Sequence, residues 1–292
     1  MKYFLLLSIS FFLVFTGLFA ITLQSWGEYS GWVKDSDYYF HWSRANGECP
    51  TRFYDYEKCV SYSPMYSMIT KYFSGNEIVF NFFPMILTIF LIPIILFYTT
   101  RSIFSTLIYF SSVFVFNIFY ASIFAHALLS LLFVLILVSK KHLTFWNGGL
   151  YALSLFSHSQ AVYVMLPLFL YKAWQDYGKV ILYAMSPSLI LLKNKADEMT
   201  FNHLFFLGFP SNWFYTFKLE QSKVLLIFYF IIGAIAINYR SLLFIPLLWS
   251  VWLPSFYEKS PYKKILAVGM VLFIIVQFIG FYRQTNLFPP IV

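Results

Sequence analysis

The chain has 292 residues, of which 60% are hydrophobic, 23% aromatic and only 11% charged. A soluble domain carries about 25% charged residues, so this composition excludes a water-soluble globule and also a disordered chain. The net charge of +8 comes from isolated Lys and Arg residues between apolar runs. This arrangement gives no basic cluster for a nucleic acid and is typical of the cytoplasmic turns of a membrane protein. We therefore predict an all-α, polytopic transmembrane helix bundle, with residues 1–292 forming a single integral membrane domain.

Apolar runs separated by charges predict about ten transmembrane helices. The first is Met1 to Leu23, where the length of the apolar run and the lack of a small-residue cleavage site favour a signal anchor over a cleaved signal peptide. The others are predicted near 78–98, 102–119, 122–138, 143–157, 160–172, 180–192, 224–239, 241–255 and 265–282. Bases are densest in the resulting inner turns, so both termini are predicted on the inner side (N-in/C-in).

Two longer polar segments, 25–76 and 193–223, are predicted to be outer loops of this bundle. The first contains six of the 12 acidic residues. It also contains Cys49 and Cys59, ten positions apart. Because an extracytoplasmic loop meets an oxidising environment, a local disulfide between these cysteines is expected.

The strongest local signal for chemistry is DSDYYFHW, from Asp35 to Trp42, just after the first helix. In extended chain Asp35 and Asp37 project to the same side, where the two carboxylates suit a divalent cation (Mg²⁺ or Mn²⁺) or a general base with a stabilising charge. His41 follows one helical turn after Asp37 if a helix begins here. A solvated pair of acids at a helix start is the structural alternative.

A second signal is the predicted hairpin 143–172, which makes two crossings in 30 residues. Each helix would rise about 22 Å, whereas the hydrocarbon layer is about 30 Å thick. The tip, containing His158 and Gln160, would therefore lie inside the membrane beside a cavity that opens outward. His126 is predicted near the outer start of another helix, and Arg52 lies in the first outer loop.

Several of these segments together resemble the GT-C superfamily of polytopic glycosyltransferases. The resemblance rests on the acidic loop after the first helix, the segment SYSPMYSMITKYFSG (Ser61 to Gly75), and two later hairpin segments, Phe116 to Lys141 and Leu153 to Lys172. It covers residues 1–192. The chain departs from the family in its short length, in the lack of a C-terminal soluble domain, and in the absence of a second acid between Tyr120 and His126.

This resemblance implies an inverting transfer of a sugar from a polyprenyl- or dolichyl-phosphate donor to a glycan, lipid or protein acceptor. The reaction would take place on the extracytoplasmic or lumenal face of a plasma membrane or endoplasmic reticulum membrane. Asp37, or else Asp35, takes the role of general base or metal ligand. Cationic and donor side chains near the leaving phosphate and the sugar are expected in the substrate site; the candidates are His41, His126, His158, Gln160 and Arg52.

Two other functions fit parts of the pattern. A Wzy-like polysaccharide polymerase also has D-x-D-Y-Y near its N-terminus and a buried His-x-Ser, which His158 to Gln160 approaches. A transporter or a scaffold subunit of a membrane complex is the non-enzymatic alternative, although no internal repeat is seen.

Overall fold

The computed structural model describes residues 86–112, 124–139, 142–157, 161–177, 212, 225, 227 and 244–284. These residues form helices and connecting turns without a strand, so the predicted all-α class is confirmed for this part of the chain. The elements in order are η2 (Ile86–Leu91), α6 (Ile92–Thr100), α7 (Ile103–Phe110), α9 (Phe124–Val138), α10 (Phe145–Ser157), α11 (Ala161–Tyr177), α16 (Ile245–Trp252), α17 (Pro254–Lys259) and α18 (Lys263–Gln284). Within the described ranges, no helix combines the length and the apolar character that a membrane crossing requires.

Most helix positions agree with the apolar runs of the sequence. The structure places α9 and α10 within two residues of the predicted 122–138 and 143–157. Helix α11 is longer than predicted and continues past Lys172 to Tyr177. Ala173 and Gln175, which follow Lys172, are both good helix formers, so the charge at Lys172 does not end the helix.

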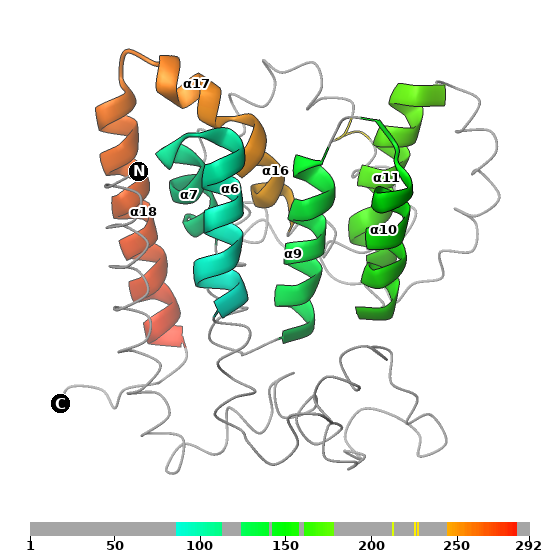
Figure 1. Ribbon diagram of the computed structural model, residues 1–292. Coiled ribbons are helices and arrows are strands. Elements are labelled where there is room, and N and C mark those ends of the chain that lie inside the picture. Colours follow the sequence, from blue (N-terminus) through cyan, green and yellow to red (C-terminus); the bar gives the residue numbers. More distant parts are fainter. Residues whose placement is uncertain are drawn as a thin grey trace, which may run out of the picture.

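The predicted helix 241–255 is interrupted in the structure. Helix α16 ends at Trp252, and α17 begins with Pro254. Proline has no N–H to donate to the carbonyl four residues earlier, so the helix breaks before it and restarts with proline in its first turn. Together, α16, α17 and α18 form a helix–bend–helix unit over residues 245–284 (Figure 1).

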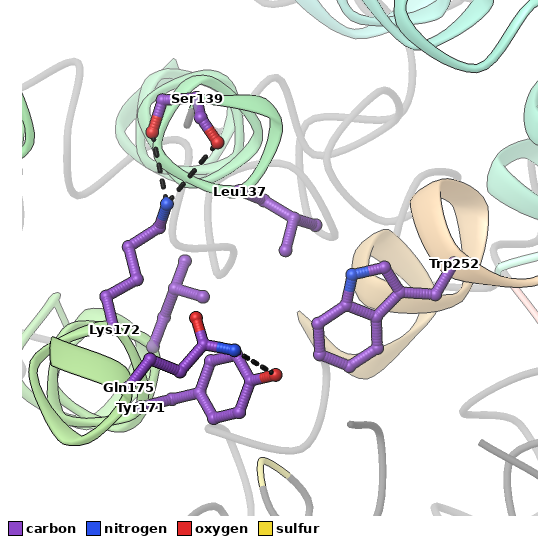
Figure 2. Close-up of a pocket in the computed structure, with 7 residues that line it drawn as sticks. Leu137, Ser139, Tyr171, Lys172, Gln175 and Trp252 are labelled. Atoms are coloured by element: carbon purple, nitrogen blue, oxygen red, sulfur yellow. Dashed lines mark hydrogen bonds between the residues drawn. The ribbon is translucent and has the colours of Figure 1, made fainter. Parts of the chain in front are cut away.

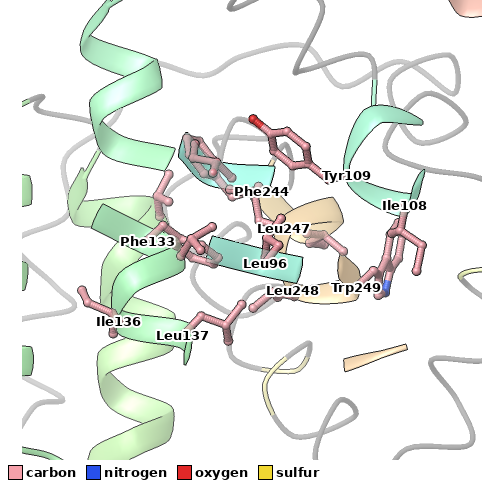
Figure 3. Close-up of a cluster of buried hydrophobic side chains, with 14 of the residues drawn as sticks. Leu96, Ile108, Tyr109, Phe133, Ile136, Leu137, Phe244, Leu247, Leu248 and Trp249 are labelled. Atoms are coloured by element: carbon pink, nitrogen blue, oxygen red, sulfur yellow. The ribbon is translucent and has the colours of Figure 1, made fainter. Parts of the chain in front are cut away.

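The described helices run side by side with short turns at their ends (Figure 1). Helices α6, α7, α9 and α16 enclose the centre of the hydrophobic core, where Leu96, Ile108, Phe133 and Trp249 are fully or almost fully buried (Figure 3). The rings of Phe133 and Phe244 lie 5.8 Å apart between α9 and the start of α16. Residues from distant parts of the sequence thus share one core.

The first described element is a π-helical turn, η2, which ends two residues before Pro93. In a π-helix the N–H of residue 93 would bond to the carbonyl of residue 88, but proline has no N–H. The hydroxyl of Tyr109 on α7 donates to the Thr88 carbonyl at 2.8 Å and takes the place of this missing bond. The wide turn is therefore held by a side chain from the neighbouring helix.

One part of the predicted topology is wrong. The alternation of helices places Arg101 on the inner side and the turn 256–264 on the outer side, yet the Ser102 hydroxyl donates to Glu258 Oε1 at 2.7 Å. The turns before α7 and before α18 therefore lie at the same end of the bundle, and α18 runs from there to the other end (Figure 1). The prediction that these two turns lie on opposite sides is therefore wrong. The predicted alternation agrees with the directions of α6 to α11 and is already reversed at α16, before the bend at Pro254.

Candidate functional site

Most of the predicted site lies outside the described residues. This holds for the acidic pair, for the first-loop residues and cysteines, and for the tip of the hairpin: Asp35, Asp37, His41, Cys49, Arg52, Cys59, His158 and Gln160. His126 is the predicted site residue that the structure describes. The chemistry assigned to the others remains a prediction from sequence.

His126 lies in the first turn of α9, where it is partly buried, and its carbonyl accepts a hydrogen bond from the Ser130 hydroxyl at 2.8 Å. Its predicted position at the start of a helix is confirmed. The last residue of α10, Ser157, and the first residue of α11, Ala161, are at this same end of the bundle, as is Ile86 (Figure 1). We call this the His126 end.

The opposite end of the bundle carries most of the charge. Five of the six described Lys and Arg residues lie there: Arg101, Lys172, Lys259, Lys263 and Lys264. Asp176 and Glu258 are at the same end, each engaged in hydrogen bonds. We call this the basic end. The described charges are therefore strongly polarised along the helix axes.

A polar network joins three helices at the basic end. Lys172 Nζ on α11 donates to the hydroxyl and carbonyl oxygens of Ser139, at 3.2 and 3.5 Å. The Ser139 hydroxyl lies 2.6 Å from Oδ1 of Asn147 on α10, and Asn147 Nδ2 donates to the His142 carbonyl at 3.0 Å. Asn147 is fully buried and also belongs to the first turn of α10, where its N–H donates to the hydroxyl of Thr144 at 3.2 Å. This residue is the centre of the network.

Asp176, near the end of α11, binds the turn that lies next to this network. Its carboxylate accepts from the Leu143 N–H and from His142 Nδ1, both at 2.6 Å. An ionised carboxylate only accepts hydrogen bonds, so this geometry places the imidazole hydrogen on Nδ1. The Leu143 N–H, and after it the His142 side chain, hold the pKa of the Asp176 carboxyl below its usual value. The turn 142–144 is thereby fastened to α11.

Helix α10 has an unusual distribution of polarity. Its buried face contains Asn147, Leu150, Ser154 and Ser157, a stripe at helical spacing in which three of four residues are polar. Its exposed face is apolar and includes Phe156 at 58% exposure. A helix on the surface of a soluble protein shows the opposite arrangement. The outward face of α10 is therefore suited to apolar surroundings.

A cleft with room for about 60 Å³ lies beside the polar network (Figure 2). We call it the Lys172 cleft; apart from leucines, its lining comes from α11, from the end of α9 and from α16: Ser139, Tyr171, Lys172, Gln175 and Trp252. Lys172 is only 3% exposed. Gln175 Nε2 donates to the Tyr171 hydroxyl at 2.9 Å. No acidic side chain lines the cleft in the described part of the chain.

No sequence motif marks this region as a site, and the predicted site residues do not include Asn147, Lys172 or Asp176. A signal was present, because Asn147, Ser154 and Ser157 are seven and three positions apart and must share one face of a helix. What the sequence could not supply was the partner of that face, since Ser139 and Lys172 come from two other helices.

Metal-binding side chains do not cluster in the described ranges, where no group of three or more His, Cys, Asp or Glu residues occurs. Comparisons of the chain with protein-family models, curated proteins and solved structures find no match.

Proposed function

We propose that the chain is a multi-pass integral membrane protein, a bundle of about ten helices. The support comes from the outward faces of the helices at the two sides of the bundle. On α18, every residue between positions 265 and 276 with an exposed side chain is aliphatic, and Leu272 in the middle is 57% exposed. On α10 the exposed face is also apolar and the polar residues are buried. Such faces are stable in lipid and costly in water.

The charges suggest how this bundle is oriented. Lys and Arg are enriched in the cytoplasmic turns of membrane proteins, and the described cations lie mainly at the basic end. We therefore place the basic end on the cytoplasmic side. The His126 end then faces the extracytoplasmic or lumenal side, together with Ile86, the first residue of η2, which follows the predicted loop 25–76 in the sequence.

At the His126 end we propose a glycosyltransferase active site of the GT-C type. The observation that carries this proposal is the common position of three features that the sequence lists separately. These are His126 on α9, the residues Ser157 and Ala161 that flank the predicted hairpin tip in the sequence, and Ile86, the first described residue after the predicted acidic loop (Figure 1). A hydrogen-bond donor at this end can bind the phosphate of the lipid-linked sugar, and an acid from the preceding predicted loop can accept the proton of the acceptor hydroxyl.

The proposed chemistry is a single displacement. Asp37, or else Asp35, accepts the proton of an acceptor hydroxyl, whose oxygen forms a bond to the anomeric carbon of the sugar. The bond between that carbon and the phosphate oxygen breaks, and the electron pair leaves with the polyprenyl phosphate. His126 would donate to the departing phosphate, where negative charge increases. A Mg²⁺ or Mn²⁺ ion held by the two aspartates would supply further charge neutralisation.

The experiment is to incubate the purified full-length protein with a panel of polyprenyl-phosphate sugars and acceptors and to measure release of the lipid phosphate. We expect a double Asp35→Asn, Asp37→Asn variant to lose at least 100-fold in rate, the usual contribution of a general base. His126→Ala should lose about 10-fold or more, and His142→Ala, a histidine at the opposite end of the bundle, should keep the wild-type rate.

Full turnover by the double aspartate variant would exclude the proposed base. Equal losses for His126→Ala and His142→Ala would mean that histidine replacement acts through stability and not at the His126 end. Joining of preformed lipid-linked oligosaccharides without turnover of any single-sugar donor would replace the transferase by the polymerase alternative.

A further inference from the structure

The Lys172 cleft lies at the basic end, away from the proposed transferase site, and its side chains can recognise a ligand of a definite charge. The lining is rich in hydrogen-bond donors: the Lys172 ammonium, the Tyr171 hydroxyl, the Gln175 amide and the Trp252 indole N–H (Figure 2). Because no carboxylate is part of the lining in the described part of the chain, this set of donors favours an anion. Lys172 is the cationic member of the set.

The network behind the cleft keeps this cation in position. Ser139 accepts from Lys172 Nζ through two oxygens, so the ammonium is held against the end of α9. The nearest acid along α11, Asp176, is turned to the other side, where it binds the Leu143 N–H and His142. The Asp176 carboxylate is therefore bound at the turn 142–144 and is not part of the cleft lining, to which Lys172 belongs.

The orientation of Tyr171 adds a second donor. Its hydroxyl oxygen accepts from Gln175 Nε2 at 2.9 Å, so its own hydrogen points to another acceptor. Trp252, on α16, contributes an indole whose nitrogen faces the cleft in Figure 2. Donors from α11 and α16 thus converge on a space of about 60 Å³, which fits one phosphate group but not a large headgroup.

We propose that the Lys172 cleft binds a phosphate-bearing anion, with Lys172 as the charge partner and Tyr171, Gln175 and Trp252 as hydrogen-bond donors. Two sources supply this chemistry: the phosphate of an anionic lipid and soluble phosphate. A cytoplasmic position of the basic end would place the cleft near the anionic leaflet of a membrane. The proposal requires only the described cleft and does not depend on transferase activity at the His126 end.

The test uses the purified full-length protein in detergent and measures lipid retained in native mass spectrometry. The probes are phosphatidylglycerol, phosphatidylcholine and inorganic phosphate. Wild-type protein should retain phosphatidylglycerol at least fivefold better than phosphatidylcholine, and Lys172→Met should remove this preference. Lys264→Met, which removes one positive charge at the same end but outside the cleft, should keep the preference.

Trp252→Phe provides a second variant, in case Lys172→Met does not fold. It keeps an aromatic ring at the contact and removes the N–H, and it should weaken binding about two- to fivefold while leaving the thermal midpoint without ligand unchanged. Displacement of the lipid by millimolar inorganic phosphate would show that both ligands use the same cleft. Binding of phosphate without binding of phosphatidylglycerol would identify soluble phosphate as the source.

Three results would overturn the proposal. The first is equal retention of phosphatidylglycerol and phosphatidylcholine by the wild type, with no binding of inorganic phosphate. The second is unchanged anion binding in folded Lys172→Met and Trp252→Phe. The third is an equal loss of binding in Lys264→Met, because this would assign the effect to the net charge of the basic end.

Discussion

Helices α10 and α18 lie on opposite sides of the described bundle and share one property, an apolar outward face (Figure 1). Their inward faces differ. α18 packs with Met270 and Ile274, whereas α10 buries Asn147, Ser154 and Ser157. The apolar outward faces indicate that both helices have the same apolar surroundings. The inward faces show that α18 is held by apolar packing and α10 by hydrogen bonds as well. A polar inner face is stable here because Ser139 and His142 provide partners for Asn147.

Both helices are fastened at the basic end by a carboxylate. On the α18 side, Glu258 in α17 accepts from the Ser102 hydroxyl, and Tyr257 stacks on Phe104 with ring centroids 5.3 Å apart. On the α10 side, Asp176 holds the turn 142–144. Two carboxylates thus fasten the described bundle at the basic end, while the bond from Tyr109 to the Thr88 carbonyl fastens η2 to α7 elsewhere.

The largest expected effect comes from a charge on the shared outward face. Leu272→Lys on α18 and Leu153→Lys on α10 should each oppose membrane insertion by about 2.5–3.5 kcal/mol, the cost of a lysine near the bilayer centre. Membrane-inserted protein after carbonate extraction is the measurement, with Leu272→Ala as the matched control. If these faces met water instead, each lysine substitution would cost no more than about 0.5 kcal/mol. Lysine variants that are recovered in the membrane as well as Leu272→Ala would therefore contradict the lipid-facing assignment.

The difference between the inward faces can be tested next. Asn147→Leu should destabilise the fold by about 1–3 kcal/mol, because it leaves the Ser139 hydroxyl with one acceptor fewer and the His142 carbonyl without this donor. Met270→Leu on α18 conserves volume and should cost less than about 1.5 kcal/mol. Denaturant or thermal unfolding in detergent measures both, and a stabilised Asn147→Leu would show that α10 is held by packing alone.

A smaller effect is expected where α7 meets α17. Ser102 caps α7 by accepting from the Phe104 N–H at 3.2 Å while it donates to Glu258. Ser102→Ala removes both bonds and should cost about 1 kcal/mol. Ser130→Ala is the control, since within the described ranges the Ser130 hydroxyl bonds to the His126 carbonyl of its own helix and not to another element. Similar unfolding midpoints for the two variants would argue against a connection between α7 and α17.

The smallest effect is a dependence on pH at the α10 side. The Leu143 N–H and His142 lower the pKa of the folded Asp176 carboxyl. The resulting stability is fully present above the unfolded carboxyl pKa, about 3.9, and is lost as the pH falls through the lower folded pKa. Thermal unfolding between pH 3 and 7 should show a wild-type advantage over Asp176→Asn that disappears at the acid end. An advantage that grows on acidification would contradict this sign.

The candidate site could be predicted from the sequence only where chemistry is local. The D-x-D motif at Asp35 and Asp37 and the position of His126 at a helix start follow from neighbouring residues, and the second of these is confirmed. The Lys172 cleft could not be predicted in this way. Its donors come from α11 and α16, which are about 80 residues apart in the chain, and no pattern in either helix reveals the other.

The sequence by itself determined the helical class and the positions of α9 and α10, because apolar runs of helical length favour backbone hydrogen bonds within each segment. Only the tertiary structure decided which ends of the helices lie together. The bond between Ser102 and Glu258 places the turn before α18 at the same end as the turn before α7, and the Lys172 network appears only when α9, α10 and α11 pack. The physical reason is that hydropathy describes one segment at a time, whereas hydrogen-bonded contacts between helices depend on their relative direction and rotation.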